Sequence, residues 1–374
     1  MDAALMQSRN PQSRTPRWAV LGAGNGGQSL AGHLAILGFS VRLYDIVPAT
    51  IEAIAKNKGV EVDGAVNGFG AIDFATTRIE EILDGADVVM VVAPAIAHRA
   101  IAKQCSPHLA DGQIVFLHPG ATCGALEFRK ALDDERCKAA VRIAEASSLL
   151  YTCRSSSPGH ASILGIKKVL PVAALPARDT AGVLATLQTA FPQMQPAPNV
   201  FQTSFENPNI MVHPAPTVLS TALVESDRDW LYYPDGITPS VGAFVEKMDL
   251  ERLAVGRALG LQLPTILEWY RKTYDTDGAT LSEAVRRNKA YDKVKGQHTL
   301  HTRYILEDVP MALTPVISLG KLLGLPTPMM QTIAALAEFL VGKDLTTTGR
   351  TVERLGLAGM NAQAILRFVE HGER

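Results

Sequence analysis

Hydrophobic positions in the first half of the chain fall into short runs that are separated by helical segments. The runs are continuous and rich in β-branched residues, as in Val88-Val-Met-Val-Val92, which is typical of parallel strands buried on both faces. The expected strands are residues 18–21, 88–92, 113–118, 141–145 and 161–174, and the expected helices are residues 96–109 and 178–191. Strands that alternate with helices predict an α/β domain with a doubly wound parallel sheet.

The pattern changes after a proline-rich connector at residues 192–198. Beyond it, alternation with a period of two is almost absent. Helical periodicity recurs instead at residues 239–259, 263–273, 309–323, 327–341 and 361–370. A chain of 374 residues is also too long for one compact core. We therefore expect a flexible tail over residues 1–16, an α/β domain over residues 17–199 and an all-α domain over residues 200–374, with the chemistry in the cleft between the two domains.

A glycine-rich turn follows the first expected strand. The sequence Arg17-Trp-Ala-Val-Leu-Gly-Ala-Gly-Asn-Gly-Gly27 joins an apolar run to a helical stretch that stops at Gly38, and a second apolar run then ends at Asp45. Strand, glycine turn, helix, strand and acid in this order are typical of the dinucleotide-binding βαβ unit of Rossmann domains. The alternative is an ordinary tight βα turn that binds no cofactor.

The residues of this turn have separate roles in such a unit. Gly22 permits the sharp turn, Gly24 lets a pyrophosphate approach the backbone, and Gly27 lets the helix pack close to the strand. The free N–H groups that open the helix, at Asn25 and Gly26 among others, face the phosphates.

The acid at the end of the second strand bears on the choice of cofactor. Asp45 lies about 20 residues beyond the turn, the usual distance for an acid that holds the adenosine ribose hydroxyls. A 2′-phosphate would meet a like charge there, so Asp45 favours NAD(H) over NADP(H). Arg42 is close in sequence, which keeps NADP(H) open as an option.

Composition excludes several other classes of function. The net charge of −1 gives no electrostatic footprint for nucleic acid or for an anionic membrane. The four cysteines have neither a CxxC pair nor zinc spacing, which indicates reduced thiols in a cytosolic protein. The N-terminal residues lack the apolar run of a signal peptide, and the longest apolar runs are too short to span a bilayer. We therefore expect a cytoplasmic protein.

A nicotinamide enzyme needs a proton donor or acceptor beside the carbon that exchanges the hydride, and histidine suits this at neutral pH. Of the nine histidines, His213 opens the helical domain beside a helix-breaking proline and can face a cleft, although a structural or surface role is the alternative. Asp308 is either the N-cap of a helix or a carboxylate that fixes a histidine tautomer. Arg303 either clamps a substrate carboxylate with two parallel hydrogen bonds or forms a surface salt bridge.

Two other features are weaker candidates. Cys153 follows an apolar run at an expected strand end, where open α/β sheets present ligand contacts, although a lone cysteine is more often inert. His298 and His301 are three residues apart, but no third ligand lies nearby. We therefore expect no metal site.

A series of short motifs in a fixed order covers nearly all of residues 17–374. They are Gly22-Ala-Gly-Asn-Gly-Gly27, Val92-Ala-Pro-Ala-Ile-Ala-His98, His118-Pro-Gly-Ala-Thr-Cys-Gly-Ala125, Tyr151-Thr-Cys-Arg154, Val212-His-Pro214, Tyr233-Pro-Asp-Gly-Ile-Thr-Pro-Ser240, Met248-Asp-Leu-Glu-Arg-Leu253, Arg303 to Pro310, Ser318-Leu-Gly and Pro326-Thr-Pro328. Taken together, these motifs resemble the opine dehydrogenase family. That family includes octopine and nopaline dehydrogenases and bacterial N-(carboxyethyl)amino acid dehydrogenases.

The resemblance implies a Rossmann domain, a helical domain and a specific reaction. The family condenses the amine of an amino acid with a 2-oxo acid, often pyruvate, and reduces the imine with NAD(P)H to a secondary amine dicarboxylate. Carried over by motif, His213 is the catalytic histidine, Asp308 is its carboxylate partner and Arg303 anchors a substrate carboxylate. The resemblance also places Cys153 and His118 on the substrate side. Residues of the cofactor site carried over in this way are Ala93 and Pro94.

Departures from the family pattern leave the amine substrate open. His118 stands where a neutral amide is usual, and residues 220–225 replace a more typical Asn-Ala-Gly segment. The expected partners are a 2-oxo acid and an amino acid, with a homodimer as one option for the oligomeric state.

Two alternatives to this interpretation stay open. A ketopantoate-reductase-like enzyme or a 2-hydroxyacid dehydrogenase would reduce a carbonyl with a catalytic lysine, and no lysine lies in a comparable glycine-rich helical context. A non-catalytic NAD-sensing module would keep the glycines but would need neither His213 nor Asp308.

Overall fold

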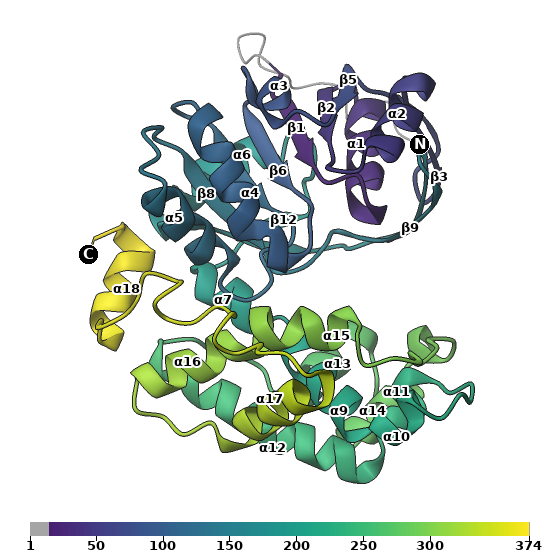
Figure 1. Cartoon of the computed structure of the whole chain (residues 1–374), viewed down its shortest axis with the longest axis vertical. Helices are drawn as coiled ribbons and strands as arrows, with labels where there is room; N and C mark the ends of the chain where they lie inside the picture. The colour runs from purple at the N-terminus through teal and green to yellow at the C-terminus, as the bar shows by residue number, and fades with distance from the viewer. Residues whose placement is uncertain (1–14, 374) are drawn as a thin grey trace.

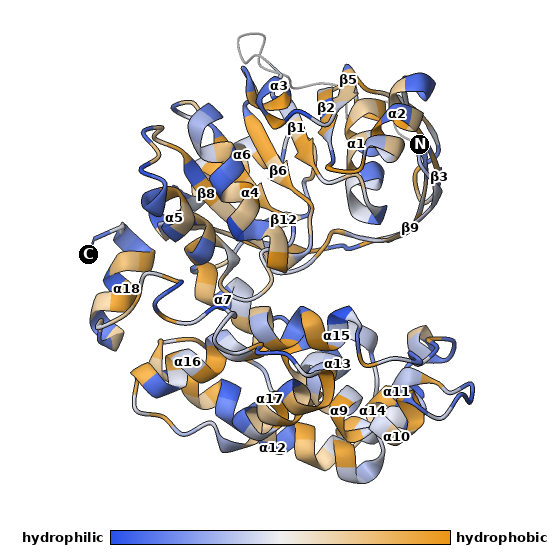
Figure 2. Ribbon diagram, in the orientation of Figure 1, coloured by the Kyte–Doolittle hydropathy of each residue, from blue (hydrophilic) through white to orange (hydrophobic). Residues whose placement is uncertain are grey.

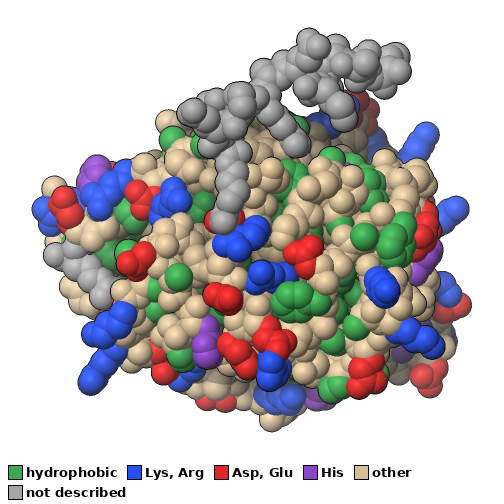
Figure 3. All heavy atoms as spheres, turned by 90° about the horizontal axis from the view of Figure 1, so that it is seen from above, with side chains coloured by type: hydrophobic (Ala, Val, Ile, Leu, Met, Phe, Trp, Pro, Cys, Tyr) green, Lys and Arg blue, Asp and Glu red, His purple; other side chains and the backbone are tan. Residues whose placement is uncertain are grey.

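The computed structural model describes residues 15–373. It has two halves: the first contains the β-sheets, and the second is built from helices (Figure 1). The tail expected over residues 1–16 lies outside the described residues up to residue 14. On the face of the first half seen from above, acidic and basic side chains are interspersed (Figure 3). No helix within residues 15–373 has both the length and the apolar character needed to cross a bilayer.

The central sheet has eight strands in the order β12-β11-β8-β7-β6-β1-β2-β5. The strands are β1 (Arg17–Leu21), β2 (Ser40–Tyr44), β5 (Phe74–Thr76), β6 (Val88–Val91), β7 (Ile114–Leu117), β8 (Arg142–Ala146), β11 (Leu170–Leu175) and β12 (Met194–Pro196). From β5 to β8 all neighbouring strands run parallel. The order β5-β2-β1-β6-β7-β8 is that of a doubly wound Rossmann sheet, whose ligands bind where the order reverses, between β1 and β6. The predicted fold class is confirmed.

Beyond β8 the sheet departs from the prediction. β11 runs antiparallel to β8. The single strand expected at residues 161–174 is in fact nearly all of two strands, His160–Ile166 and Leu170–Leu175, which lie in different sheets. The chain leaves β8 through a hairpin instead of a helix on the sheet face, so no crossover forces β11 to be parallel. The prediction of one strand at this position was wrong.

The hairpin belongs to a second, four-stranded sheet that the sequence pattern did not reveal. Its order is β4-β3-β10-β9, with strands β3 (Gly59–Gly64), β4 (Gly68–Ala71), β9 (Tyr151–Ser157) and β10 (His160–Ile166). All four strands contact α1 (Asn25–Ile36), so this sheet covers the helix that follows the glycine turn. A Cβ atom at Gly32 of α1 would lie 2.5 Å from Cγ2 of Val62, which shows how closely the helix and the second sheet pack.

Helices cover the central sheet and form the whole second half. Around the sheet lie α1, α2 (Pro48–Asn57), α3 (Ile79–Leu83), α4 (His98–Cys105), α5 (Gly124–Asp134) and α6 (Thr180–Leu187). The remaining helices are α7 (Val200–Phe205), α8 (Asn209–Val212), α9 (Pro214–Leu219), α10 (Thr221–Val224), α11 (Tyr232–Gly236), α12 (Pro239–Ala258), α13 (Ile266–Tyr274), α14 (Leu281–Arg287), α15 (Arg303–Leu306), α16 (Thr314–Leu322), α17 (Pro328–Val341) and α18 (Ala362–His371). Short 3₁₀ helices and one π-helical turn, Val309–Leu313, lie between them.

The two halves share one hydrophobic core. Apolar residues concentrate in the strands and on the inner sides of the helices (Figure 2). One buried cluster joins Leu117 and Phe128 of the α/β half to Phe201, Met248 and Leu313 of the helical half. α7 packs against β8 and β11, and α18 lies beside the α/β half (Figure 1). The relative position of the two halves is therefore set by packing as well as by the connector.

A buried arginine adds polar ties between the halves. Arg350, in the segment after α17, is fully buried, and its Nε donates to Oε2 of Glu127 on α5 at 2.7 Å. Its Nη1 donates to the carbonyl oxygens of Gly120 and Thr122, which follow β7. Burial alone would raise the pKa of Glu127, but the charge and hydrogen bond of Arg350 hold it below its ordinary value. Burial, with a further contribution from the same charge, lowers the pKa of His98 on α4 to about 3.

We predict that Arg350→Met destabilises the protein strongly, because Glu127 then loses its main buried counter-charge. Removal of one partner of a buried ion pair costs about 3–5 kcal/mol of unfolding free energy. The control Arg99→Met breaks the more exposed Arg99–Asp134 pair, for which about 0–1 kcal/mol is expected. Thermal and urea unfolding measure both. Equal losses in the two variants would contradict a structural role for Arg350.

Candidate active site

The glycine turn has the geometry that its sequence predicts. Gly22 has φ of +109°, and a Cβ there would lie 2.2 Å from the carbonyl oxygen of Val92. A Cβ at Gly27 would lie 1.7 Å from the carbonyl oxygen of Gly22, whereas nothing lies within 4 Å of a Cβ at Gly24. No side chain among the described residues caps α1 at its start. The backbone is therefore close-packed at two glycines and open where a pyrophosphate would approach.

Two polar side chains hold this turn in place. Asp45 follows β2, and its Oδ2 accepts a hydrogen bond from the backbone N–H of Ala23 at 2.6 Å. Oδ1 of Asn25 accepts from the N–H of Ser155 on β9 at 2.8 Å, which ties the turn to the second sheet. The other residues expected at the cofactor site, Ala93 and Pro94, lie in the loop that follows β6, the strand beside β1. The residues present therefore fit a bound dinucleotide along the carboxyl ends of β1, β2 and β6.

We predict that Asp45→Ser weakens NADH binding and shifts the preference toward NADPH. The substitution removes the acceptor for the ribose hydroxyls and the charge that repels a 2′-phosphate. Fluorescence titration with both cofactors measures the ratio of dissociation constants. Asp73→Ser is the control, because Asp73 is exposed and accepts from Ser40, away from the turn. A native preference for NADPH would show that Asp45 does not have this role.

The candidate acid–base pair lies in the helical half. Nδ1 of His213 and Oδ2 of Asp308 are 2.7 Å apart, and their side chains are only 8% and 6% exposed. His213 lies between α8 and α9, where Pro214 begins the next helix. Asp308 precedes the π-helical turn, but its carboxylate makes no N-cap hydrogen bond. Asp308 is therefore the N-cap residue by position, but its carboxylate bonds the imidazole instead of capping the turn.

The hydrogen bond also selects one nitrogen for chemistry. With Nδ1–H donating to Asp308, Nε2 is the nitrogen that could exchange a proton with a substrate. No described residue hydrogen-bonds Nε2 of His213. A π-helical turn such as Val309–Leu313 is common beside functional residues, and here it directly follows Asp308.

Two tyrosines that the sequence analysis did not select fix the imidazole further. The ring of Tyr304 stacks on His213, with centroids 3.9 Å apart and an angle of 18° between the planes. The hydroxyl of Tyr232 donates to the carbonyl oxygen of His213 at 2.9 Å. Burial raises the pKa of the Tyr304 phenol, although the charge of Arg303 opposes this rise. In the sequence, the feature that could have indicated Tyr304 as a site residue is its position next to Arg303.

Arg303 is the first residue of α15 and is 59% exposed, with its Nε 3.6 Å from Oε2 of Glu307. One short segment thus holds Arg303, Tyr304 and Asp308 together. The charge of Arg154 on β9 makes a further, smaller contribution that opposes the rise in the pKa of Tyr304 caused by burial. Arg154 was part of a quoted motif but was not selected as a site residue. The exposed positive charge of Arg303 suits an anionic substrate.

His118 and Cys153 are enclosed in the α/β half instead. His118 is fully buried, and its Nε2 accepts from the N–H of Leu150 at 2.9 Å. Burial, with a smaller contribution from Lys167, lowers its pKa to about 3. Cys153 lies within β9, so its expected place at a strand end was wrong. Burial raises the pKa of its thiol, and no hydrogen bond links either side chain to the pair.

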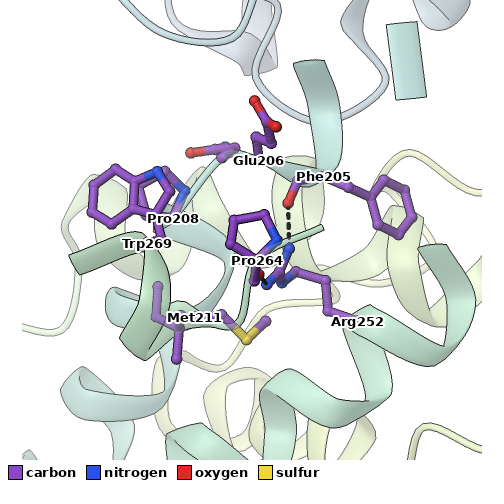
Figure 4. A pocket seen from close by; sticks show the side chains of 9 residues that line it. Phe205, Glu206, Pro208, Met211, Arg252, Pro264 and Trp269 are labelled. Carbon is purple, nitrogen blue, oxygen red and sulfur yellow. Dashed lines mark hydrogen bonds between the residues drawn. The ribbon is translucent and has the colours of Figure 1, made fainter. Parts of the chain in front are cut away.

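A small pocket lies beside the turn that leads from α7 to α8 (Figure 4). The Arg252 guanidinium at its wall donates to the carbonyl oxygens of Phe205 and Pro264 and to Oδ1 of Asp249. These bonds tie α12 to the end of α7, just before the segment that carries His213. The residues around the pocket therefore help to hold the site in place. Within residues 15–373 no three His, Cys, Asp or Glu side chains are grouped to hold a metal ion.

Comparison with known proteins gives one consistent result. Residues 196–341 match the family described as NAD/NADP octopine/nopaline dehydrogenase, alpha-helical domain, and residues 17–129 match the N-terminus of NAD-dependent glycerol-3-phosphate dehydrogenase. The opine dehydrogenase of Arthrobacter sp. (strain 1C) is 41% identical over 94% of this chain and 98% of its own length. Vitopine synthase of Allorhizobium ampelinum is 25% identical, over 93% and 97%.

Solved structures agree with the fold. Octopine dehydrogenase with NADH and L-arginine superposes with a TM-score of 0.80 at 24% identity and covers 94% of this chain and 98% of its own. A ketopantoate reductase from Ralstonia eutropha JMP134 gives a TM-score of 0.60 at 20% identity, over 87% and 98%.

The chain belongs to the opine dehydrogenase family. It is an NAD(P)-dependent oxidoreductase that acts on the CH–NH group of its donors. The predicted family, enzyme class and nicotinamide cofactor are confirmed, and the alternative of a non-catalytic NAD-sensing module is wrong.

Proposed function

We propose that this enzyme condenses a 2-oxo acid, most simply pyruvate, with the amine of an amino acid and reduces the resulting imine to a secondary amine dicarboxylate. It also catalyses the reverse oxidation. The observation that carries the proposal is the buried His213–Asp308 pair beside Arg303. Two solved structures of one relative support the substrate class, since octopine dehydrogenase was solved with NADH and pyruvate and with NADH and L-arginine.

His213 is proposed to move protons during imine formation. The amine attacks the oxo carbon and forms a carbinolamine; Nε2–H of protonated His213 then gives its proton to the hydroxyl group, which leaves as water as the C=N bond forms. Asp308 holds Nδ1–H throughout and stabilises the charged imidazole. The bound nicotinamide supplies the hydride that reduces the imine carbon.

Arg303 is proposed to orient the 2-oxo acid. Its planar guanidinium can hold a carboxylate with two parallel hydrogen bonds, which aligns the carbon that accepts the hydride. The 59% exposure of its side chain leaves it accessible to a substrate. Cys153 and His118 stay in the proposal only as residues on the substrate side of the α/β half.

The domain roles, the cellular compartment and the partners of the enzyme are also proposed. Residues 17–199 form the cofactor domain and residues 200–374 the substrate domain, behind a tail at residues 1–16. The cytoplasm is the expected compartment, which the free cysteines at positions 105, 123, 137 and 153 support. A homodimer remains one option, and the partners are small molecules.

We predict that NADH is consumed rapidly only when a 2-oxo acid and an amino acid are both present, because an imine needs both. A panel of amino acids with pyruvate, read at the nicotinamide absorbance, tests this. Omission of the amine is the control. Full-rate oxidation of NADH by the oxo acid alone would mean carbonyl reduction, and the ketopantoate-reductase-like alternative would replace the proposal.

We also predict that His213→Ala lowers turnover by roughly 10²–10⁴-fold, the usual contribution of general acid–base catalysis. Asp308→Asn should fold and bind NADH but turn over poorly, because the amide cannot stabilise the charged imidazole. His298→Ala is the matched control, since His298 is exposed and 3.8 Å from Asp229. Near-normal turnover in both pair variants would remove the pair from the mechanism.

A further inference from the structure

One residue of the cofactor domain, Ala95, is hydrogen-bonded through both its N–H and its carbonyl oxygen to the other half of the chain. Ala95, one residue beyond Pro94, begins a short 3₁₀ helix, Ala95–Ala97, that leads into α4. Its backbone N–H donates to Oε1 of Glu307 at 2.9 Å. Its carbonyl oxygen accepts from Nη2 of Arg350 at 3.4 Å. Ala95 is only 3% exposed; its bond to Arg350 is buried, and its bond to Glu307 is partly buried.

Glu307 and Arg350, the two residues that bond Ala95, also connect directly to the segment from Arg303 to Pro310, which carries Asp308. Glu307 is the residue before Asp308, and its other oxygen, Oε2, lies 3.6 Å from Nε of Arg303. The backbone N–H of Arg350 donates to the carbonyl oxygen of Pro310, two residues beyond Asp308, at 2.9 Å. The segment from Arg303 to Pro310 is thus fixed to the loop that follows β6.

We propose that Glu307 is a positioning residue that sets the distance between the His213–Asp308 pair and the nicotinamide. This inference rests on the proposed function. Glu307 itself is assigned no contact with the substrate. Glu307 acts through the Ala95 N–H on the cofactor side and through the backbone of Asp308 on the acid–base side. Its Oε2, 3.6 Å from Nε of Arg303, also helps to keep that exposed arginine aligned.

The physical reason is that the two reacting parts come from different halves. The hydride donor must lie on the cofactor domain, near Ala93 and Pro94, whereas the proton donor is carried by the helical half. A relative shift of about 1 Å can cost on the order of 10²-fold in rate, even when binding is intact. A direct hydrogen bond between the segments limits that shift without contact with either reactant.

Two substitutions separate the hydrogen bond from the charge. Glu307→Ala removes both, whereas Glu307→Gln keeps an oxygen that can accept from Ala95 N–H. Glu135→Ala is the matched control, because the Glu135–Lys103 ion pair, at 3.2 Å, lies entirely within the α/β half. All variants are compared as full chains with NADH bound.

The first measurement is amide hydrogen exchange of the peptide that contains residues 93–98, which needs no activity. We expect faster exchange in Glu307→Ala and native protection in Glu307→Gln and Glu135→Ala. Unchanged exchange in Glu307→Ala, or equal loss of protection in both Glu307 variants, would overturn the proposal. If the wild type reduced no imine, the proposed function would fail. The exchange measurement would still show whether Glu307 protects the Ala95 N–H.

The second measurement is steady-state kinetics per NADH-binding site. We expect kcat of Glu307→Ala to fall on the order of 10–10²-fold with unchanged NADH affinity. Glu307→Gln should recover most of that loss, which a merely destabilised protein would not show once rates are referred to bound NADH. Wild-type kcat in Glu307→Ala would overturn the proposal.

Discussion

The hydrogen bond between His213 and Asp308 is the constraint on which the site depends. It joins residues 95 positions apart, and it is buried, so each partner would be costly to leave alone. Several features of the helical half serve it: the stacked ring of Tyr304, the hydroxyl of Tyr232 on the His213 carbonyl, and the π-helical turn after Asp308. Together they leave Nε2 without a hydrogen bond to any described residue, as the proposed proton transfer requires.

A fixed pair is useful only if its distance from the cofactor is also fixed. The shared apolar core gives the general placement, but apolar packing has little directional preference. Directional ties come from buried polar groups, with Arg350 bonded to the loops after β6 and β7 and Glu307 bonded to Ala95. These bonds converge on the strand ends where a Rossmann sheet presents its cofactor.

Much of this could be predicted because it is local in the sequence. The glycine turn, the central strands and the long helices α12 and α17 follow from spacing and periodicity. The second sheet could not be predicted in this way, because its short strands contain glycine and polar residues and are held by α1. Of the site, His213 and Asp308 were found through motifs, while Tyr304, Glu307 and Arg350 depend on contacts between distant segments. Cys153 was misplaced because its strand belongs to the unrecognised sheet.

The most direct test of the account is the protonation of the His213 ring, observed by ¹⁵N NMR of histidine-labelled enzyme with His213→Ala used for assignment. The account predicts that Nδ1 keeps its proton in both charge states, because Asp308 accepts it, and that Nε2 is the nitrogen that loses a proton as pH rises. In Asp308→Asn this preference should be lost. A neutral His213 with its proton on Nε2 in the native enzyme would contradict the central claim, because Nε2 would then not be the nitrogen that gives up its proton to the substrate.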